Sequence, residues 1–263
     1  FALRGQEGLS DSMAFQGMFT FNPNNIHLMD EYQGGFAQFI KAPSVSIAAL
    51  PDNFPLEYAV RLGYMGTAYH ALKRAGVHYG STVLINGATG TVGTSAVLLS
   101  LAMGASKVVA VANKKDRLQR IKQLNPAIIE VLSLQDGDVA GKIKELTNGK
   151  GVESFIDCLS YVDTTSTQQC LFAVKKGGTA VCLGGATGSL TVPYGFLLGT
   201  EINLTGSIWF HTYEIDEIVS LASSGRLNLN SLETKKFPLD MVNEAIELAG
   251  SRLGGLTTVM INI

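Results

Sequence analysis

The chain has 263 residues and a formal net charge of −2, and its composition is 46% hydrophobic and 16% charged. This apolar content excludes a disordered chain, and the absence of a basic block argues against a nucleic-acid or anionic-lipid surface. No apolar stretch approaches the roughly 18 residues of a membrane span. The three cysteines, Cys158, Cys170 and Cys182, are too widely spaced for a disulfide framework, so we expect a reducing, cytoplasmic environment.

The first 54 residues contain several turn-forming sequences, including NPNN, DEYQGG and LPDN. Two runs between these turns look like strands, FAQFIK (36–41) and SVSIAA (44–49). This pattern predicts a β-rich fragment that is too short to form an independent core.

From Ser81 onward, short β-branched runs alternate with helix-like segments. The expected strands cover 82–86, 107–112, 127–132, 153–158, 179–185 and 202–208. A helix that ends near Gly104 is expected between the first two strands. Further helices are expected over 114–124, 139–147 and 164–174. Apolar strands separated by helices predict an α/β fold with a doubly wound, Rossmann-like parallel sheet of six strands. Two further helices (214–223 and 240–251) and a terminal strand (257–263) should follow.

A glycine-rich turn, Asn86-Gly-Ala-Thr-Gly-Thr-Val-Gly93, stands directly after the first of these strands. A helix that begins there points unpaired amides and a positive dipole end at the turn, which suits a diphosphate. Gly90 would let the diphosphate approach the amides of Thr91 and Val92, and Gly93 would let the helix lie close to the strand. Because Ala88 replaces the first glycine of GxGxxG, the strict pattern is not met. A turn without a ligand is the alternative.

The end of the second strand bears on the choice between NAD and NADP. An NAD site normally has an Asp or Glu here to accept a hydrogen bond from the ribose 2′-hydroxyl. Ala112 occupies that place, and Asn113, Lys114 and Lys115 follow it. An uncharged rim beside two ammonium groups favours the 2′-phosphate of NADP(H). Alternatively, the two lysines form a solvated first turn of a helix.

At this point the chain resembles the medium-chain dehydrogenase/reductase superfamily, which contains zinc-type alcohol dehydrogenases and quinone reductases. The resemblance rests on segments spread over the chain: residues 34–54, MGTAYHAL (65–72), GATGTVG (87–93), ELTNGKGVESFIDC (145–158) and GGTAVCLGG (177–185). It implies a partial GroES-like catalytic domain over 1–60, a coenzyme-binding Rossmann domain over 61–210 and a return to the catalytic domain over 211–263. It also implies a homodimer, through pairing of edge strands.

The resemblance further implies which residues line the coenzyme. Residues at the carboxyl ends of the last three sheet strands would surround the nicotinamide and its ribose: Cys158, Leu159, Leu183, Gly184, Gly185, Ser207 and Ile208. With the glycine turn and the second strand, the expected coenzyme-binding set also includes Ala88, Gly90, Thr91, Val92, Gly93, Asn113, Lys114 and Lys115. Tyr64 and Thr67 would lie at the nicotinamide end as candidate catalytic residues.

Departures from the family pattern predict that both zinc sites are missing. Tyr64 aligns with a cysteine ligand of the catalytic zinc, and Ala2 and Ser10 stand where the structural-zinc segment has cysteines. The histidines are scattered, without a carboxylate or cysteine partner at ligand spacing: His27, His70, His78 and His211. Family members also have roughly a hundred residues before this point. The chain is therefore expected to be either a fragment or a shortened member.

Three further groups are considered for catalysis. Tyr69 and Lys73 match the YxxxK spacing of short-chain dehydrogenases but precede the glycine turn, so we interpret them as helix packing. We expect Asp157 to orient a loop and His211 to lie at an interface or the edge of a cleft.

The sequence therefore predicts a zinc-independent, NADP(H)-dependent oxidoreductase that reduces a small carbonyl or an activated alkene such as an enone or quinone. The proton would come from Tyr64, from water or from the segment that family members have before this point, and the alternative interpretation of Tyr64 is a packed aromatic at the vacated metal position. The alternative hypothesis is a non-catalytic or repurposed member that binds a nucleotide or a protein partner without redox turnover.

Overall fold

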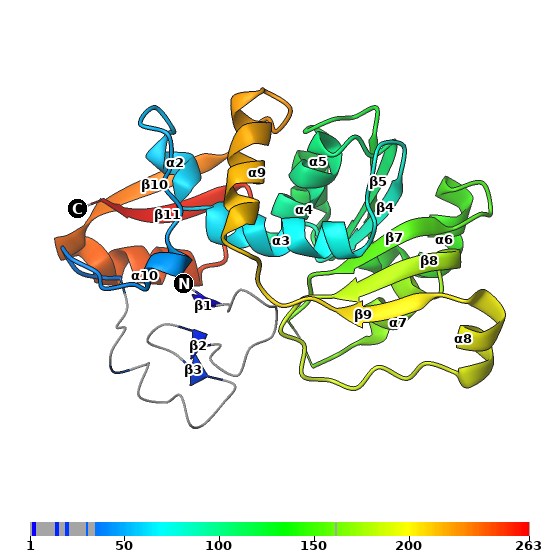
Figure 1. Ribbon diagram of the computed structural model, residues 1–263. Helices are drawn as coiled ribbons and strands as arrows, with labels where there is room; N and C mark the ends of the chain where they lie inside the picture. Colours follow the sequence, from blue (N-terminus) through cyan, green and yellow to red (C-terminus); the bar gives the residue numbers. More distant parts are fainter. Residues whose placement is uncertain are drawn as a thin grey trace.

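The computed structural model of the chain describes residues 2–3, 14–15, 19–20, 30, 35–160 and 162–262. Its two parallel sheets are a larger one of six strands and a smaller one of two. Figure 1 shows the larger sheet in green and yellow and the smaller one in orange and red, with helix α3 (Leu62–Arg74) running between them. This helix therefore connects the two parts of the fold.

The larger sheet confirms the expected doubly wound α/β architecture. Its strand order is β6-β5-β4-β7-β8-β9, and all neighbouring strands are parallel. The strands are β4 (Thr82–Asn86), β5 (Lys107–Ala112), β6 (Ile129–Ser133), β7 (Val152–Asp157), β8 (Val174–Cys182) and β9 (Asn203–Gly206). The direction in which strands are added reverses between β4 and β7, and such a switch point leaves a crevice outside the carboxyl ends of the strands.

The sheet forms because its strands are apolar on both faces. Val83 and Ile85 belong to one buried cluster, whereas Leu84 between them belongs to the other. The first cluster is covered by four helices: α3, α4 (Thr91–Ala102), α5 (Lys115–Lys122) and α9 (Tyr213–Ser223). Helices α6 (Val139–Leu146), α7 (Thr165–Leu171) and α8 (Tyr194–Thr200) cover the second.

Several element boundaries differ from those expected. β6 begins at Ile129 rather than at residue 127, because the amides of Ile128 and Ile129 both donate to the Asn125 carbonyl in a turn. β8 ends at Cys182, since the amides of Leu183 and Gly184 both donate to the Asp157 carbonyl. β9 ends at Gly206 rather than at residue 208.

The expectation of strands at 36–41 and 44–49 is wrong. Residues 36–41 have no regular structure, and Ser44–Ser46 form a 3-10 helix. Phe39 is 90% exposed, and neither run pairs with a strand among the described residues. A strand needs a hydrogen-bonding neighbour, which is why alternating residues alone did not make one here. The short helix α2 (Leu56–Ala59) follows.

The remaining β structure lies at the two ends of the chain. Strands β1 (Ala2–Leu3), β2 (Ala14–Phe15) and β3 (Phe19–Thr20) form a small antiparallel sheet. At the other end, β10 (Glu233–Pro238) pairs in parallel with β11 (Thr257–Asn262), and helix α10 (Val242–Gly250) lies between them in sequence. Two short 3-10 helices, Leu134–Asp136 and Leu239–Met241, complete the described elements. None of the described helices has the length and apolar character that a bilayer span requires.

Candidate functional site

The glycine turn lies at the switch point of the larger sheet. β4 ends at Asn86, Gly87 adopts a positive φ of 77°, and α4 begins at Thr91 with Gly90 as its N-cap. The amides of Gly87 and Ala88 donate to the Val111 carbonyl, which fixes the turn to the neighbouring strand. The first amides of α4 are therefore presented at the carboxyl end of the sheet, where a diphosphate would be bound.

The fit of a dinucleotide to this turn depends on close backbone packing. A methyl group on Gly93 would lie 2.1 Å from the Gly87 carbonyl oxygen. Gly90, in contrast, is exposed, and a methyl group there would approach the same oxygen only to 3.4 Å. Gly93 thus lets α4 rest directly on the turn, while Gly90 leaves the approach to Thr91 and Val92 open. The arrangement fits a coenzyme diphosphate.

The carboxyl end of β5 forms one side of this region. Ala112 is buried, whereas Asn113, Lys114 and Lys115 are exposed. The Lys115 ammonium lies 2.6 Å from Asp136 Oδ1, and this contact holds the pKa of the Asp136 carboxyl below its ordinary value. Lys115 is therefore already paired, which leaves Lys114 as the better of the two predicted phosphate ligands.

Arg117 is a further cation at this rim that sequence reasoning missed. It lies in the first turn of α5, and its Nη2 donates to the Arg252 carbonyl at 2.7 Å. Together with Thr89 and Gly254 it lines a small depression beside the glycine turn. Its place in the sequence, three residues after Lys114, is a signal that puts the two side chains on the same helical face.

The loops after β7 and β8 pack tightly against the turn. A methyl group on Gly87 would lie 3.2 Å from the Leu159 side chain, and one on Gly184 would lie 1.8 Å from the Leu159 carbonyl oxygen. The amide of Cys158 donates to the Asn86 carbonyl, and that of Gly185 donates to Ser160 Oγ at 3.3 Å. The structure thus brings these predicted coenzyme residues, including Leu183, to one edge of the sheet.

Ser207 and Ile208 follow β9 at the same edge. The Ser207 amide donates to the Cys182 carbonyl at 2.9 Å, which holds the segment beside β8. Its hydroxyl oxygen is buried and has no hydrogen-bond partner among the described residues. Since a buried hydroxyl without a partner is unfavourable, a polar ligand group at this position would satisfy it.

Tyr64 and Thr67 lie one turn apart on α3. Tyr64 is 49% exposed, while Thr67 is half-buried and donates through its hydroxyl to the Gly63 carbonyl at 2.9 Å. The segment after β9 reaches this helix, because a methyl group on Gly66 would lie 2.5 Å from the Phe210 ring. The Ser207–Phe210 segment and the α3 candidates therefore belong to one region, although the Thr67 hydroxyl is occupied within its own helix.

Asp157 orients the loops at the sheet edge, as expected. Its Oδ1 accepts from Asn86 Nδ2 at 3.1 Å, and its Oδ2 accepts from Thr167 Oγ1 at 2.8 Å. Burial raises the pKa of the Asp157 carboxyl, against the opposing effect of these hydrogen bonds. The side chain is only 4% exposed, so its role is to hold β4, β7 and α7 together.

The Tyr69–Lys73 pair is part of helix packing. Tyr69 is 9% exposed, and burial together with Glu217 raises the pKa of its hydroxyl to about 12. The Lys73 ammonium lies 5.3 Å from the Tyr69 ring centroid and forms an ion pair with Glu217 at 2.9 Å. A phenol with this pKa is a poor proton donor near neutral pH.

His70 has a carboxylate partner that its spacing in the sequence does not reveal. Its Nδ1–H donates to the Glu214 carboxylate at 3.0 Å, across the seam between α3 and α9. The His211 amide donates to the same carboxylate at 2.7 Å, and the His211 ring lies against both His70 and Tyr213. The pairing was missed because 144 residues separate His70 from Glu214.

The described residues do not fit a zinc ion. No group of three His, Cys, Asp or Glu side chains among them could hold a metal. Burial raises the pKa of the Cys158 and Cys170 thiols and raises that of Cys182 to about 11. Ser10 and His27, which bear on the predicted loss of zinc ligands, lie outside the described residues.

Comparison with known proteins identifies the family. Residues 91–224, about half of the chain, match the family described as zinc-binding dehydrogenase. Sorbitol dehydrogenase from Ovis aries is 30% identical over 223 residues, which cover 84% of this chain and 61% of that protein. The chain thus spans about three fifths of the length of the curated relatives it matches.

Solved structures agree with this result. An alcohol dehydrogenase from Thermus sp. ATN1 superposes with a TM-score of 0.75 at 25% identity, over 88% of this chain and 66% of that one. An alcohol dehydrogenase from Aeropyrum pernix, at 24% identity, shares the fold with a TM-score of 0.76 over 97% of this chain and 72% of that one. The chain belongs to the zinc-binding dehydrogenase family, within the medium-chain dehydrogenase/reductase superfamily.

Proposed function

We propose that this chain is part of a nicotinamide-dependent oxidoreductase that prefers NADP(H) and reduces a carbonyl or an activated alkene. The observation that carries the proposal is the glycine turn, where Gly93 lets α4 pack on the Gly87 carbonyl and present its first amides at the switch point. The amides of Thr91 and Val92 bind the diphosphate, and Gly90 leaves room for it. The relatives described as sorbitol and alcohol dehydrogenases support the oxidoreductase class of this proposal.

The preference for NADP(H) rests on the rim after β5. Ala112 offers no carboxylate to a ribose 2′-hydroxyl, and Lys114 is an exposed ammonium beside it. Arg117, held by the Arg252 carbonyl, adds a second positive charge on the same side of α5. These groups favour a 2′-phosphate through charge-assisted hydrogen bonds. Lys115, in contrast, is paired with Asp136 and contributes less.

A nicotinamide held at the carboxyl ends of β7, β8 and β9 would supply or accept a hydride. The buried Ser207 hydroxyl offers a partner for a polar group there, and the loops after β7 and β8 pack closely against the glycine turn. Tyr64 Oη, half-exposed on α3, is the candidate group for moving a proton to substrate oxygen. Tyr64 stands where the family pattern has a cysteine ligand of the catalytic zinc, and on this ground we propose a reaction that does not depend on zinc.

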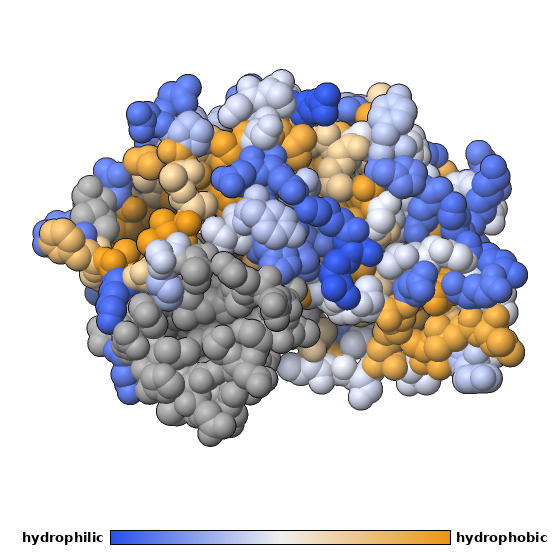
Figure 2. All heavy atoms as spheres, viewed as in Figure 1, coloured by the Kyte–Doolittle hydropathy of each residue, from blue (hydrophilic) through white to orange (hydrophobic). Residues whose placement is uncertain are grey.

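A homodimer is also proposed, through β9. This strand is at the edge of the larger sheet, and Leu204 on it is 39% exposed. Figure 2 shows an apolar patch over neighbouring α8, where Leu198 is 70% exposed. An edge strand that has one neighbour among the described strands and lies beside an apolar patch suits pairing with a second copy of the chain.

Calorimetric titration with NADPH and NADH tests the coenzyme assignment. We expect NADPH to bind at least about 10-fold tighter, which corresponds to one charge-assisted contact to the 2′-phosphate. Lys114→Ala should remove most of this difference, whereas Lys144→Ala, on α6, should leave it unchanged. Equal affinities for the two coenzymes would overturn the NADP preference, and no binding of either would overturn the proposed function.

Turnover is tested separately, with a panel of enones, quinones and simple carbonyls and with or without added zinc. NADPH oxidation without zinc supports the proposal. Tight coenzyme binding without turnover of any of these substrates would favour the non-catalytic alternative.

A further inference from the structure

Arg61, at the start of α3, is a buried cation that the proposed reaction does not use. Its side chain is 2% exposed. Nη1 donates to the Gly255 carbonyl at 3.1 Å, and Nη2 donates to the carbonyls of Glu233 at 2.5 Å and Leu256 at 3.2 Å. Nε has no hydrogen-bond partner within the described part of the chain.

Burial of the Arg61 guanidinium raises the free energy of the folded state unless other contacts replace its lost hydration. Buried charges are normally paired with an opposite charge, and burial lowers the pKa of the Arg61 guanidinium. The nearby Glu233 carboxylate partly offsets this effect, but its oxygens contact Arg120 and Thr257 instead. The hydrogen bonds of Arg61 thus go to main-chain carbonyls, and the fixed fork of a guanidinium is suited to holding several of them at once.

The main chain that Arg61 holds continues directly into the glycine turn. The Gly255 amide donates to the Thr89 carbonyl at 2.8 Å. A methyl group on Gly255 would lie 2.3 Å from the Gly90 carbonyl oxygen and 2.1 Å from Thr94 Oγ1. Gly255 is therefore clamped between the Arg61 guanidinium on one side and the residues that precede and begin α4 on the other.

Arg61 is also the N-cap of α3, and its carbonyl accepts from the Met65 amide at 2.9 Å. Tyr64 and Thr67 lie within the next two turns of that helix. Figure 1 shows α3 starting beside β11 and running toward the larger sheet. A single side chain thus connects the helix that carries the candidate catalytic groups with the turn that receives the diphosphate.

We propose that Arg61 is a positioning residue for the coenzyme: it holds Gly255 against the glycine turn and so fixes the first amides of α4 relative to α3. This inference rests on the proposed function for its coenzyme, and it assigns to Arg61 no contact with the coenzyme or the substrate. If Arg61 served folding alone, its replacement in a folded protein would leave coenzyme affinity unchanged.

The test compares Arg61→Lys with Arg74→Lys. Lysine keeps the charge but loses the fork, and Arg74 is a matched control because it lies at the far end of α3, where it is exposed and contacts Thr205. We expect Arg61→Lys to accelerate hydrogen exchange of the Gly255 amide by at least about 10-fold and to weaken NADPH binding by about the same factor, the loss expected for one hydrogen bond from a charged group. Arg74→Lys should change neither.

A folded Arg61→Lys variant with wild-type NADPH affinity would overturn the inference. Gly255→Ala provides a second route, because it disturbs the same contact while leaving Arg61 in place. It should also weaken NADPH binding, and the double variant should lose less than the two single losses combined, since both act through one contact. Wild-type affinity in Gly255→Ala would equally overturn the inference.

Failure of the proposed function is distinguishable from failure of this inference. If the wild-type protein binds neither NADPH nor NADH, the proposed function fails. Exchange of the Gly255 amide in Arg61→Lys still reports whether Arg61 holds the turn, because that measurement is made without coenzyme. Unchanged exchange would refute the clamp itself.

Discussion

The two parallel sheets of this protein are stabilised in different ways. In the larger sheet, residues such as Leu84, Ile85 and Val109 are completely buried, and apolar side chains pack on both faces. In the smaller sheet, β10 has no buried residue and β11 buries only Met260. The smaller sheet is joined to the rest by Leu256, which belongs to the first buried cluster, and by the carbonyls that Arg61 binds.

The difference in burial between the two sheets shows where polar contacts contribute most to holding the fold together. Parallel sheets are normally covered on both faces, and the larger sheet follows that rule. The smaller sheet has only one buried residue, so specific hydrogen bonds contribute a larger share of what fixes its position. We therefore expect apolar substitutions to have the greatest effect in the larger sheet, and polar substitutions to matter most where the two parts meet.

The largest effect is expected for Phe155→Ala, in the centre of β7. Phe155 is 1% exposed, and loss of a buried aromatic ring should lower the free energy of unfolding by about 3–5 kcal/mol. Urea unfolding followed by circular dichroism measures this change. Phe39→Ala is the matched control, because Phe39 is 90% exposed and its removal should have little effect.

Gly93→Ala should have the next largest effect. Its methyl group would lie 2.1 Å from the Gly87 carbonyl oxygen, and because the clash is with backbone, the turn must move. We expect a loss of about 2–3 kcal/mol in the free energy of unfolding and a loss of coenzyme binding. Gly63→Ala on α3 should instead stabilise the protein by up to about 1 kcal/mol, because the added methyl group would meet no atom within 4 Å beyond its chain neighbours and its own helix backbone. Equal effects of the two substitutions would contradict the close packing of α4 on the turn.

Glu214→Gln tests the seam between α3 and α9. Burial raises the pKa of the Glu214 carboxyl, but hydrogen bonds from His70 and the His211 amide outweigh it, so the pKa lies below its ordinary value of 4.5. The ionised carboxylate therefore stabilises the fold above about pH 4.5, and this contribution disappears as the pH falls below that value. The substitution should cost about 2 kcal/mol at neutral pH.

The difference between the Glu214→Gln variant and the wild type should narrow in acid, which urea unfolding at a series of pH values will show. Glu217→Gln is the control, since the Glu217 carboxylate is 40% exposed and should contribute less. A difference that stays constant down to pH 3 would mean that ionised Glu214 does not stabilise the seam.

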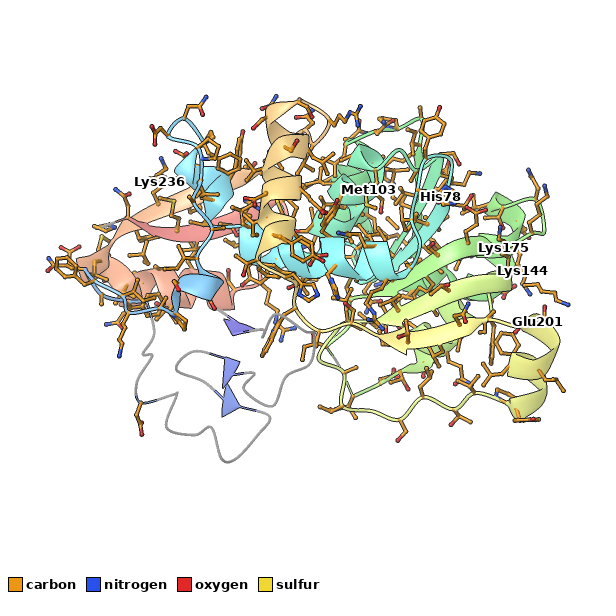
Figure 3. All side chains as sticks on the ribbon, in the orientation of Figure 1. His78, Met103, Lys144, Lys175, Glu201 and Lys236 are labelled. Carbon is orange, nitrogen blue, oxygen red and sulfur yellow. The ribbon has the colours of Figure 1, made fainter. Side chains whose placement is uncertain are left out.

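The smallest effect is expected for Lys175→Met, in β8 of the larger sheet. Its ammonium lies 2.6 Å from Glu153 Oε1, but both side chains are at least one third exposed. Such pairs contribute at most about 0.5–1 kcal/mol. Figure 3 labels Lys175 at the larger sheet and Lys236 on the smaller one, where it pairs with Glu57. If polar contacts matter more at the smaller sheet, thermal melts should show a greater loss for Lys236→Met than for Lys175→Met.

Much of the larger sheet could be predicted from sequence because its signals are local. Continuous β-branched runs such as TVLIN and KVVAVA marked β4 and β5 at their observed bounds. The glycine turn was found for the same reason, since strand, turn and helix follow one another directly. The strands expected at 36–41 and 44–49 were wrong because strand formation depends on a distant partner that local alternation does not supply.

The polar contacts at the seams could not be predicted in this way. His70 meets Glu214 across 144 residues, and Arg61 meets Gly255 across 194. One signal was available for Arg61, because an arginine between Val60 and Leu62 interrupts an otherwise apolar helix start. The coenzyme and catalytic assignments of Lys114, Ser207 and Tyr64 stay predictions.

The single tryptophan of the chain has a practical consequence. Trp209 adopts a left-handed backbone conformation, with φ of 49°, immediately after Ser207 and Ile208 at the carboxyl end of β9. Reduced nicotinamides absorb light at the wavelengths that tryptophan emits, whereas oxidised ones do not. Arrival of a reduced coenzyme at this edge of the sheet should therefore quench the intrinsic emission by energy transfer, so the unlabelled protein carries its own optical reporter.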